Sequence, residues 1–254
     1  MESAEKREIK VEETKIEGRN AVIEAFRSGK PIDKLFLLDG CQDGPIKTIL
    51  REAKKGDTII NFVSKERLDQ ISDTGKHQGA IAYAAAYEYS EVEDMLALAK
   101  ERGEAPFLII LDGIEDPHNL GAIIRTANQA GAHGVIIPKR RAVGLTATVA
   151  RTSAGALNYT PVAKVTNIVQ TMEELKKEGL WFVCADMDGE VMYRQNLTGP
   201  IGLVIGNEGE GVSRLVKETC DFTASIPMKG QIDSLNASVA MGILAYEIVR
   251  QRMK

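Results

Sequence analysis

The sequence predicts an α/β fold built around a parallel sheet. Strand-like and helix-like segments alternate along most of the 254 residues, and such alternation is typical of a parallel sheet that is covered by helices. The strand candidates of the C-terminal part, such as residues 107–111 and 134–137, are continuous apolar runs. Strands that are buried on both faces have this pattern. Taken alone, these observations favour a doubly wound sheet.

The composition excludes a membrane protein and a disulfide scaffold. Hydrophobic residues make up 44% of the chain and charged residues 27%, which is ordinary for a globular protein with a core. No apolar run reaches the roughly 18–20 residues of a membrane span, and residues 1–15 lack the apolar stretch of a signal peptide. Cys41, Cys184 and Cys220 have no C-x-x-C spacing. This cysteine usage indicates a reducing, cytoplasmic location.

The first third of the chain predicts a small α/β unit over residues 15–87. It follows a tail, residues 1–14, whose Glu- and Lys-rich composition predicts disorder. Ser64 is the expected N-cap of a short helix. Apolar periodicity and flanking Pro and Gly residues set the other boundaries. The remaining elements expected in this unit are helices over residues 18–28 and 45–55 and strands over 34–38, 58–63 and 79–83.

An amphipathic helix within residues 88–105 is expected to link this unit to a second one, residues 106–254. Asn119 is the expected N-cap of the first helix of the second unit, and Ser234 or Asn236 that of the last. The other elements are assigned from buried apolar runs and 3.6-residue periodicity. The strands expected here cover residues 107–111, 134–137, 180–185, 202–205 and 222–226, and the helices cover 120–130, 167–177, 212–219 and 235–252.

The net charge of −4 speaks against a general coat protein for nucleic acids. Its distribution is uneven, however. From Pro117 through Met172 the chain has no Asp or Glu but carries six Lys and Arg, so these 56 residues sum to +6 and the other 198 to −10. This asymmetry predicts a local site for an anion.

Three segments place polar residues where a strand ends, which is where open α/β sheets bind ligands. The first contains Asn119 and Arg125. The second, residues 202–211, is rich in glycine, but its G-x-x-G-x-G spacing differs from the dinucleotide-binding fingerprint. The third runs from Ile226 to residue 240. No metal-ligand spacing uses His77, His118 or His133.

Together, in this order and spacing, the three segments resemble the signature motifs of the SpoU/TrmH family of RNA ribose 2′-O-methyltransferases. The resemblance covers roughly residues 106–254. The N-terminal unit, with Ile16-Glu-Gly-Arg-Asn-Ala-Val22 and Gly75-Lys-His-Gln-Gly79, looks like the substrate-binding domain of the subgroup that modifies a guanosine of 23S ribosomal RNA.

This resemblance implies a fold that periodicity alone does not predict. The C-terminal parallel-sheet domain would be SPOUT-like and contain a deep trefoil knot, and a small N-terminal α/β domain would bind RNA. Knots are rare exceptions among protein folds. The resemblance further implies S-adenosylmethionine as cofactor, RNA as substrate, a homodimer and no metal.

The resemblance also implies roles for particular residues. In the family, the counterpart of Arg125 is often assigned the removal of the hydroxyl proton. Because a guanidinium stays protonated, we expect Arg125 to position the substrate instead. The catalytic set would be Asn119, Arg125, Glu208, Ser234 and Asn236. The cofactor-binding set would be Gly206, Asn207, Gly209, Ile226, Met228, Leu235 and Ser238. The RNA-binding set would be Arg19, Lys139, Arg140, Arg141 and Arg151.

The last helix carries a stripe of four apolar residues, which are expected to lie mainly in the core. In the family this helix also packs in a homodimer. The stripe consists of Val239, Ile243, Tyr246 and Val249.

Other functions remain open at this level. The chain could be a ribose methyltransferase of transfer RNA, or a non-catalytic RNA-binding protein of ribosome assembly. A nicotinamide-dependent enzyme is disfavoured by the glycine spacing.

Overall fold

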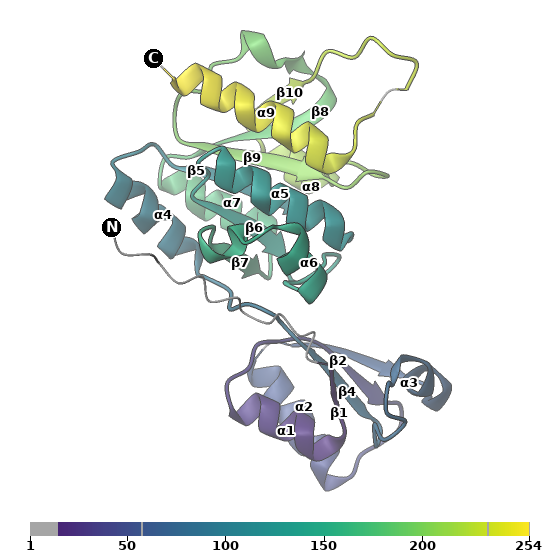
Figure 1. The fold of residues 1–254 in the computed structure, drawn as a ribbon. Helices are drawn as coiled ribbons and strands as arrows, with labels where there is room; N and C mark the ends of the chain where they lie inside the picture. Colours follow the sequence, from purple (N-terminus) through teal and green to yellow (C-terminus); the bar gives the residue numbers. More distant parts are fainter. Residues whose placement is uncertain (1–14, 57, 233, 254) are drawn as a thin grey trace, which may run out of the picture. The chain divides into compact units, whose positions relative to one another are not determined.

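The computed structural model describes residues 15–56, 58–232 and 234–253 and divides the chain into two units (Figure 1). The first unit comprises the chain up to Glu88 together with Leu145–Ala150, and the second comprises Tyr89–Gly144 and Arg151–Lys254. The predicted tail, residues 1–14, lies outside the described residues.

The first unit contains a four-stranded sheet with strand order β1-β4-β2-β3. Its elements are β1 (Lys15–Glu17), α1 (Arg19–Arg27), β2 (Ile32–Leu38), α2 (Gly44–Lys55), β3 (Ile59–Val63), α3 (Lys65–Ile71) and β4 (Ala80–Ala84). Val22 of α1 and Ile46 and Ile49 of α2 form one core with Leu35 and Leu37 of β2. All elements predicted from the sequence are confirmed, including Ser64 as the N-cap of α3. The three-residue β1 is too short to leave a sequence pattern.

The second unit contains a six-stranded sheet with strand order β10-β8-β9-β5-β6-β7, and every neighbouring pair is parallel. The strands are β5 (Phe107–Asp112), β6 (Gly134–Pro138), β7 (Val162–Val165), β8 (Trp181–Val191), β9 (Ile201–Gly206) and β10 (Phe222–Ser225). Its helices are α4 (Val92–Arg102), α5 (Pro117–Gln129), α7 (Ile168–Lys177), α8 (Arg214–Thr219) and α9 (Ala237–Arg252). Helix α6 (Ala147–Thr152) spans the boundary between the units, since its residues up to Ala150 belong to the first.

Helices cover both faces of this sheet, as the alternation predicts (Figure 1). Met95 of α4, Met172 of α7 and Val216 of α8 pack with Leu108 and Ile110 on one face. Helices α5 and α9 pack against each other on the other face. The strand ends that carry the three motif segments therefore meet at one edge of a sheet that is covered by helices on both faces.

Helix α4 packs into the second unit rather than lying in solvent as a connection. Met95 and Ala99 are buried, and the space that Met95 fills exists because position 134 is glycine. A Cβ atom on Gly134 would lie 2.2 Å from the Met95 sulfur.

The start of α5 differs from the prediction, and the expected cap at Asn119 is wrong. The helix begins at Pro117, and Asp116 is its N-cap, with its carboxylate accepting from the backbone N–H of His118 at 2.9 Å. Proline at the first helical position is preset for the helix, so the helix starts earlier than its apolar periodicity indicates. Asn119 is left inside the first turn with its side chain free for another task.

The inward face of α9 also differs from the prediction. Asn236 is its N-cap and accepts from the backbone N–H of Ser238 at 3.0 Å. Val239 and Tyr246 are 48% and 49% exposed, so placing them in the core was wrong, and Ile243 and Val249 are only half-buried. The buried residues are Ala237, Met241, Leu244, Ala245, Glu247 and Ile248. The exposed stripe is therefore available for another surface.

None of the helices in the described part of the chain is long and apolar enough to cross a membrane.

Candidate active site

Three side chains from the three motif segments meet in a closed hydrogen-bonded triangle. Asn119 Nδ2 donates to Glu208 Oε1 at 3.0 Å, and Asn236 Nδ2 donates to Asn119 Oδ1 at 2.9 Å. Asn236 Nδ2 also donates to Glu208 Oε1. Asn119 is buried. The fold thus joins residues that lie 89 and 117 positions apart into one polar group, which we call the Asn–Glu–Asn triangle.

The glycine-rich turn after β9 is organised by Asn207. The backbone N–H groups of Gly209 and Glu210 donate to Asn207 Oδ1 at 2.9 and 2.6 Å. Asn207 and Gly211 also exchange backbone hydrogen bonds at 3.2 and 3.1 Å. The turn closes so tightly over Gly206 that a Cβ atom there would lie 2.0 Å from the carbonyl carbon of Gly211. Glycine is therefore required at position 206 for packing.

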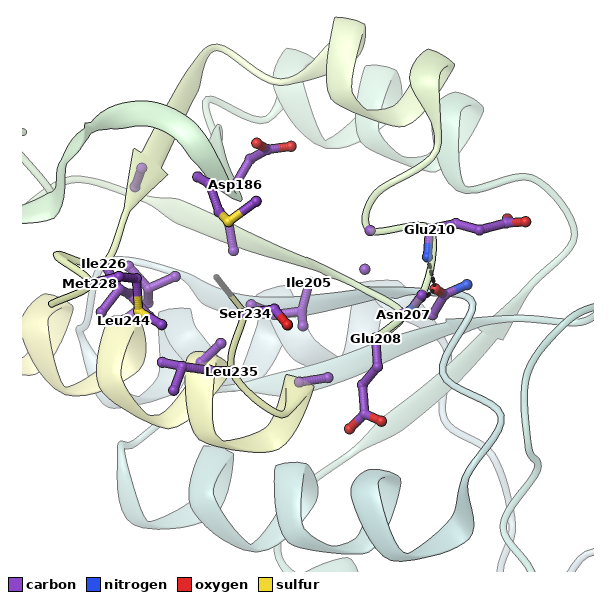
Figure 2. A pocket seen from close by; sticks show the side chains of 18 residues that line it. Asp186, Ile205, Asn207, Glu208, Glu210, Ile226, Met228, Ser234, Leu235 and Leu244 are labelled. Atoms are coloured by element: carbon purple, nitrogen blue, oxygen red, sulfur yellow. Dashed lines mark hydrogen bonds between the residues drawn. The ribbon is translucent and has the colours of Figure 1, made fainter. Parts of the chain in front are cut away.

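A first cavity of about 310 Å³ lies beside this turn (Figure 2). Figure 2 shows Ile226, Met228, Leu235 and Leu244 gathered at one side and Asn207 and Glu208 at the other. Of the predicted cofactor residues, Gly206, Asn207, Gly209, Ile226, Met228 and Leu235 line the cavity, as does Ser234. Ser238 does not; its hydroxyl donates to Asn236 Oδ1 at 2.6 Å.

The chemistry of the first cavity suits a ligand with flat apolar faces and a polar edge. Apolar side chains such as Ile226, Met228 and Leu235 line one part of it, and polar side chains such as Asp186 and Glu208 line another. No hydrogen bond joins the backbone of Met228, Ser234 or Leu235 to another described residue, so these amides and carbonyls are free to bind a ligand. A volume of 310 Å³ lies at the lower end of the roughly 300–1,000 Å³ usual for small-molecule sites.

Sequence reasoning missed Asp186, which lines the first cavity from β8. Its carboxylate accepts from Lys217 Nζ at 2.6 Å. Burial opposes ionisation of this carboxyl, but the hydrogen bonds from Lys217 and from backbone N–H groups outweigh it and keep the pKa of Asp186 below its ordinary value. Its place directly after the apolar run of residues 180–185 was the signal that could have identified it.

A second cavity of about 690 Å³ lies on the other side of the glycine-rich turn. Both cavities are lined by residues 207–211. Asn119 and Arg141 line only the second. The turn is therefore a wall that the two cavities share, and Glu208 of the Asn–Glu–Asn triangle belongs to this wall.

The predicted basic residues occupy several environments. Arg125 is exposed on α5 and lines neither cavity, and its side chain makes no hydrogen bond with the described residues. Lys139, Arg140 and Arg141 follow β6, and Arg151 lies on α6. Arg19, in the first unit, is paired with Asp43 at 2.7 Å, and its Nε donates to Gln78 O at 2.7 Å. The guanidinium of Arg19 therefore stabilises its own unit.

Known protein families match both parts of the chain. Residues 106–246 match the SpoU rRNA Methylase family, and residues 15–90 match the domain described as RNA 2′-O ribose methyltransferase substrate binding. YacO of Bacillus subtilis, which is named as a TrmH family tRNA/rRNA methyltransferase, is 50% identical over 237 residues, or 92% of this chain and 94% of YacO. A Staphylococcus saprophyticus relative with the same family name is 48% identical over 243 residues, 95% of this chain and 97% of its own.

Solved structures agree with the sequence relatives. The SpoU methyltransferase AviRb from Streptomyces viridochromogenes, in complex with AdoMet, has a TM-score of 0.60 and 26% identity, covering 95% of this chain and 91% of AviRb. The A. aeolicus TrmH/SpoU tRNA modifying enzyme has a TM-score of 0.53 and 32% identity, covering 59% and 76%.

The fold and the site thus define an RNA methyltransferase that uses S-adenosylmethionine. The chain belongs to the SpoU/TrmH family. The predicted family, the α/β fold with a parallel sheet and an N-terminal substrate-binding domain, and the cofactor are confirmed.

Proposed function

We propose that the protein transfers a methyl group to a ribose 2′-hydroxyl of a guanosine in 23S ribosomal RNA. The observation that carries this proposal is the match of residues 15–90 to the substrate-binding domain of RNA 2′-O ribose methyltransferases, beside the methylase match over residues 106–246. A solved RNA 2′-O ribose methyltransferase also resembles both parts of the chain, with a TM-score of 0.54, 26% identity and coverage of 94% of this chain and 89% of its own.

Two observations support ribosomal over transfer RNA. The family that matches the methylase unit is described as an rRNA methylase family. The A. aeolicus tRNA modifying enzyme covers only 59% of this chain, whereas the present protein carries an additional substrate-binding domain. Transfer RNA is the second candidate substrate, because YacO is named for both.

The first cavity would hold S-adenosylmethionine, which supplies an electrophilic methyl group when bound. The apolar side chains of Ile226, Met228 and Leu235 would cover the adenine faces, and free backbone groups along this segment would bind its polar edge. The turn held by Asn207 would form the opposite wall. These residues bind and orient the ligand, and orientation alone can supply much of the acceleration.

The Asn–Glu–Asn triangle would orient the attacking hydroxyl. Glu208 Oε1 accepts from both asparagines, whereas Glu208 Oε2 makes no hydrogen bond with the described residues. Oε2 is therefore free to accept a hydrogen bond from a ribose hydroxyl. The hydrogen bonds from the two asparagines hold the Glu208 carboxylate in place. Ser234, which is exposed at the cavity, would contribute a further hydrogen bond.

Arg125 would bind an RNA phosphate next to the target ribose. A guanidinium cannot take a proton, since its pKa lies above about 12, but its fork matches two phosphate oxygens. Its side chain has no partner among the described residues. The hydroxyl proton would leave through that phosphate or water.

The proposal includes a homodimer in the cytoplasm that binds RNA through its basic residues. The exposed apolar stripe of α9, with Val239 and Tyr246, supports a partner chain. The cysteines of the described residues are free, which suits a reducing compartment. The RNA would contact Lys139, Arg140, Arg141 and Arg151, and Arg19 would shape the surface of the N-terminal unit.

The test is methyl transfer in vitro from S-adenosylmethionine with an isotope-labelled methyl group. Purified protein is mixed with unmodified 23S RNA, 16S RNA or transfer RNA, and the products are digested to nucleosides. We expect label in 2′-O-methylguanosine from 23S RNA. Label on a base, or in transfer RNA alone, would refute the proposal, and absence of S-adenosylmethionine binding by calorimetry would favour a non-catalytic RNA-binding protein.

A further inference from the structure

We propose that the second cavity receives the target guanine base, and that Glu115 and Arg141 recognise two of its edges. This inference rests on the proposed function, because it assigns the substrate's base to the space beside the transfer site.

The position of the second cavity is the first step. Glu208 lines both cavities, and Asn119 lines the second. A hydroxyl held by Glu208 therefore sits at the shared wall. In a nucleoside the base is attached to C1′, the carbon next to the one that carries the 2′-hydroxyl. A ribose at the wall with its 2′-oxygen toward the first cavity places its base within reach of the second.

The charge of the second cavity is the next step. Five carboxylate side chains line it, those of Asp112, Glu115, Asp116, Glu208 and Glu210, against the single cation of Arg141. Such a lining repels a phosphate. Within the described residues no three of these carboxylates form a metal-binding group. A neutral ring with several hydrogen-bond donors is the part of a nucleotide that fits.

Only some of these groups are free to recognise a base. Asp112 Oδ2 accepts from the backbone N–H of Ser213 at 2.7 Å, and Asp116 caps α5. By contrast, the side chains of Glu115, Glu210 and Arg141 make no hydrogen bond or ion pair with the described residues. Glu210 lies on the turn that both cavities share, whereas Glu115 and Arg141 line only the second cavity. In the cavity of about 690 Å³, Glu115 offers two acceptor oxygens and the Arg141 guanidinium offers paired N–H donors.

The side chains of Glu115 and Arg141 together match guanine better than any other RNA base. Its N1–H and 2-amino groups are adjacent donors, which one carboxylate can accept together. Its O6 and N7 are adjacent acceptors, which one guanidinium can bind as a pair. Adenine has an amino group where guanine has O6, and the pyrimidines have no N7.

The backbone holds the two recognition residues in place. Arg141 has a φ of 55°, a left-handed conformation that is uncommon for residues other than glycine. The backbone N–H of Val143 donates to Ile114 O at 3.0 Å. This hydrogen bond connects the loop that carries Glu115 to the loop that carries Arg141. Groups arranged before binding lose less entropy on complex formation.

The modified guanosine is first located in the RNA by mapping 2′-O-methylation. The test then uses synthetic RNA of that site with guanosine, inosine or 7-deazaguanosine at the modified position. Inosine lacks the 2-amino group, and 7-deazaguanosine lacks N7. Equilibrium binding with S-adenosylhomocysteine and single-turnover methyl transfer are both measured. For the wild type we expect each analogue to lower the binding affinity and the rate of methyl transfer by about tenfold to a hundredfold, which is the range of one bidentate contact.

Variants then assign each edge to a residue. Glu115→Gln replaces one of the two acceptor oxygens with a donor group and should weaken the discrimination against inosine. Arg141→Ala removes the donor fork and should abolish the discrimination against 7-deazaguanosine. Alanine bears the same backbone strain as arginine at this φ, so this change isolates the guanidinium. Glu173→Gln, an exposed carboxylate on α7, is the matched control and should behave as wild type.

The outcomes separate this inference from the proposed function. Equal methylation of all three RNAs, or discrimination that both variants retain, would overturn the base pocket while leaving ribose methylation intact. An equal decrease in binding and methylation of all three RNAs in the variants would also overturn it, because these residues would then contact the sugar-phosphate backbone of the RNA rather than the base. Absence of ribose methylation on any RNA would remove the proposed function itself.

Discussion

Asn236 performs two tasks with the two ends of one amide. Its Oδ1 accepts from the backbone N–H groups of Ser238 and Val239 and so caps α9. Its Nδ2 donates to Asn119 and Glu208. The cap was a prediction that residue type alone supports. The triangle was not derivable from spacing, because it depends on three strand ends meeting in space.

Two substitutions of Asn236 separate these tasks. Asn236→Ala should lower the free energy of unfolding by about 1 kcal/mol through the lost cap, and should also lower kcat/KM. Asn236→Asp keeps the cap oxygen but replaces the donor with a negative charge beside Glu208. We expect near-normal stability by urea unfolding and a loss of kcat/KM of about tenfold to a hundredfold. Normal kcat/KM in the aspartate variant would contradict the role of the triangle.

The role of Arg125 can be tested by a change that keeps its charge. Lysine cannot present a planar fork to two phosphate oxygens. Arg125→Lys should therefore lower kcat by about tenfold or more, while the exposed position of Arg125 leaves the melting temperature unchanged. Turnover close to wild type in a single-turnover assay would count against the positioning role.

At the scale of elements, most helices and strands follow from periodicity, but their ends follow from local chemistry. The predicted ranges of α2, α7 and β5 match the structure within one or two residues. The start of α5 shifted because Asp116 and Pro117 form a stronger start signal than Asn119. Edge strand β7 was missed because Lys164 interrupts a four-residue segment. Such short strands are specified by their neighbours rather than by their own sequence.

The turn after β9 depends on the absence of a side chain at position 206. Gly206→Ala would place a Cβ atom 2.2 Å or less from the Gly211 carbonyl group and the Val212 nitrogen. Since these are backbone atoms, the turn must shift. We expect S-adenosylmethionine binding to weaken by at least tenfold in calorimetry and stability to fall by about 1–3 kcal/mol. Gly199→Ala meets nothing within 4 Å and is the control; equal behaviour of both variants would contradict this account.

The N-terminal unit contains a carboxylate that links stability to pH. Burial raises the pKa of Glu17, but hydrogen bonds from Thr74, Asp73 and Ser72 outweigh this and lower the pKa from 4.5 to about 2. A carboxyl with a lowered folded-state pKa stabilises the fold above the unfolded value and loses this contribution as pH falls from about 4.5 toward 2.

Glu17→Gln measures this contribution directly. The variant should be less stable than wild type in urea unfolding at pH 7, and the difference should shrink below pH 4.5 and vanish near pH 2. A difference that is constant from pH 7 to pH 3 would show that Glu17 acts by packing rather than by charge.

At the scale of the whole molecule, net charge is a poor guide to function. The total of −4 speaks against nucleic acid, whereas the acid-free segment of +6 carries Arg125 and the loop of Arg141. The doubly wound arrangement follows from the alternation. The trefoil knot, which the family resemblance implies, stays a prediction, because no periodicity encodes how one segment threads another.

The exposed stripe of α9 predicts the state of assembly. Tyr246→Glu places a charge on a helix face that is half exposed in one chain. We expect the wild type to be a dimer and the variant a folded monomer with strongly reduced activity in analytical ultracentrifugation and methyl-transfer assays. Leu215→Glu, on the exposed side of α8, should remain a dimer. A wild type that is an active monomer would contradict the assignment.

The central claim is that this chain methylates one ribose of a 23S ribosomal RNA guanosine. Its most direct test maps 2′-O-methylation across all ribosomal and transfer RNAs from cells with and without the gene, and from cells that express only the Glu208→Gln variant. We predict that a single guanosine of 23S RNA loses its 2′-O-methyl group without the gene, regains it with the wild type and does not regain it with the variant. An unchanged 23S map, or a loss confined to transfer RNA, would contradict the account.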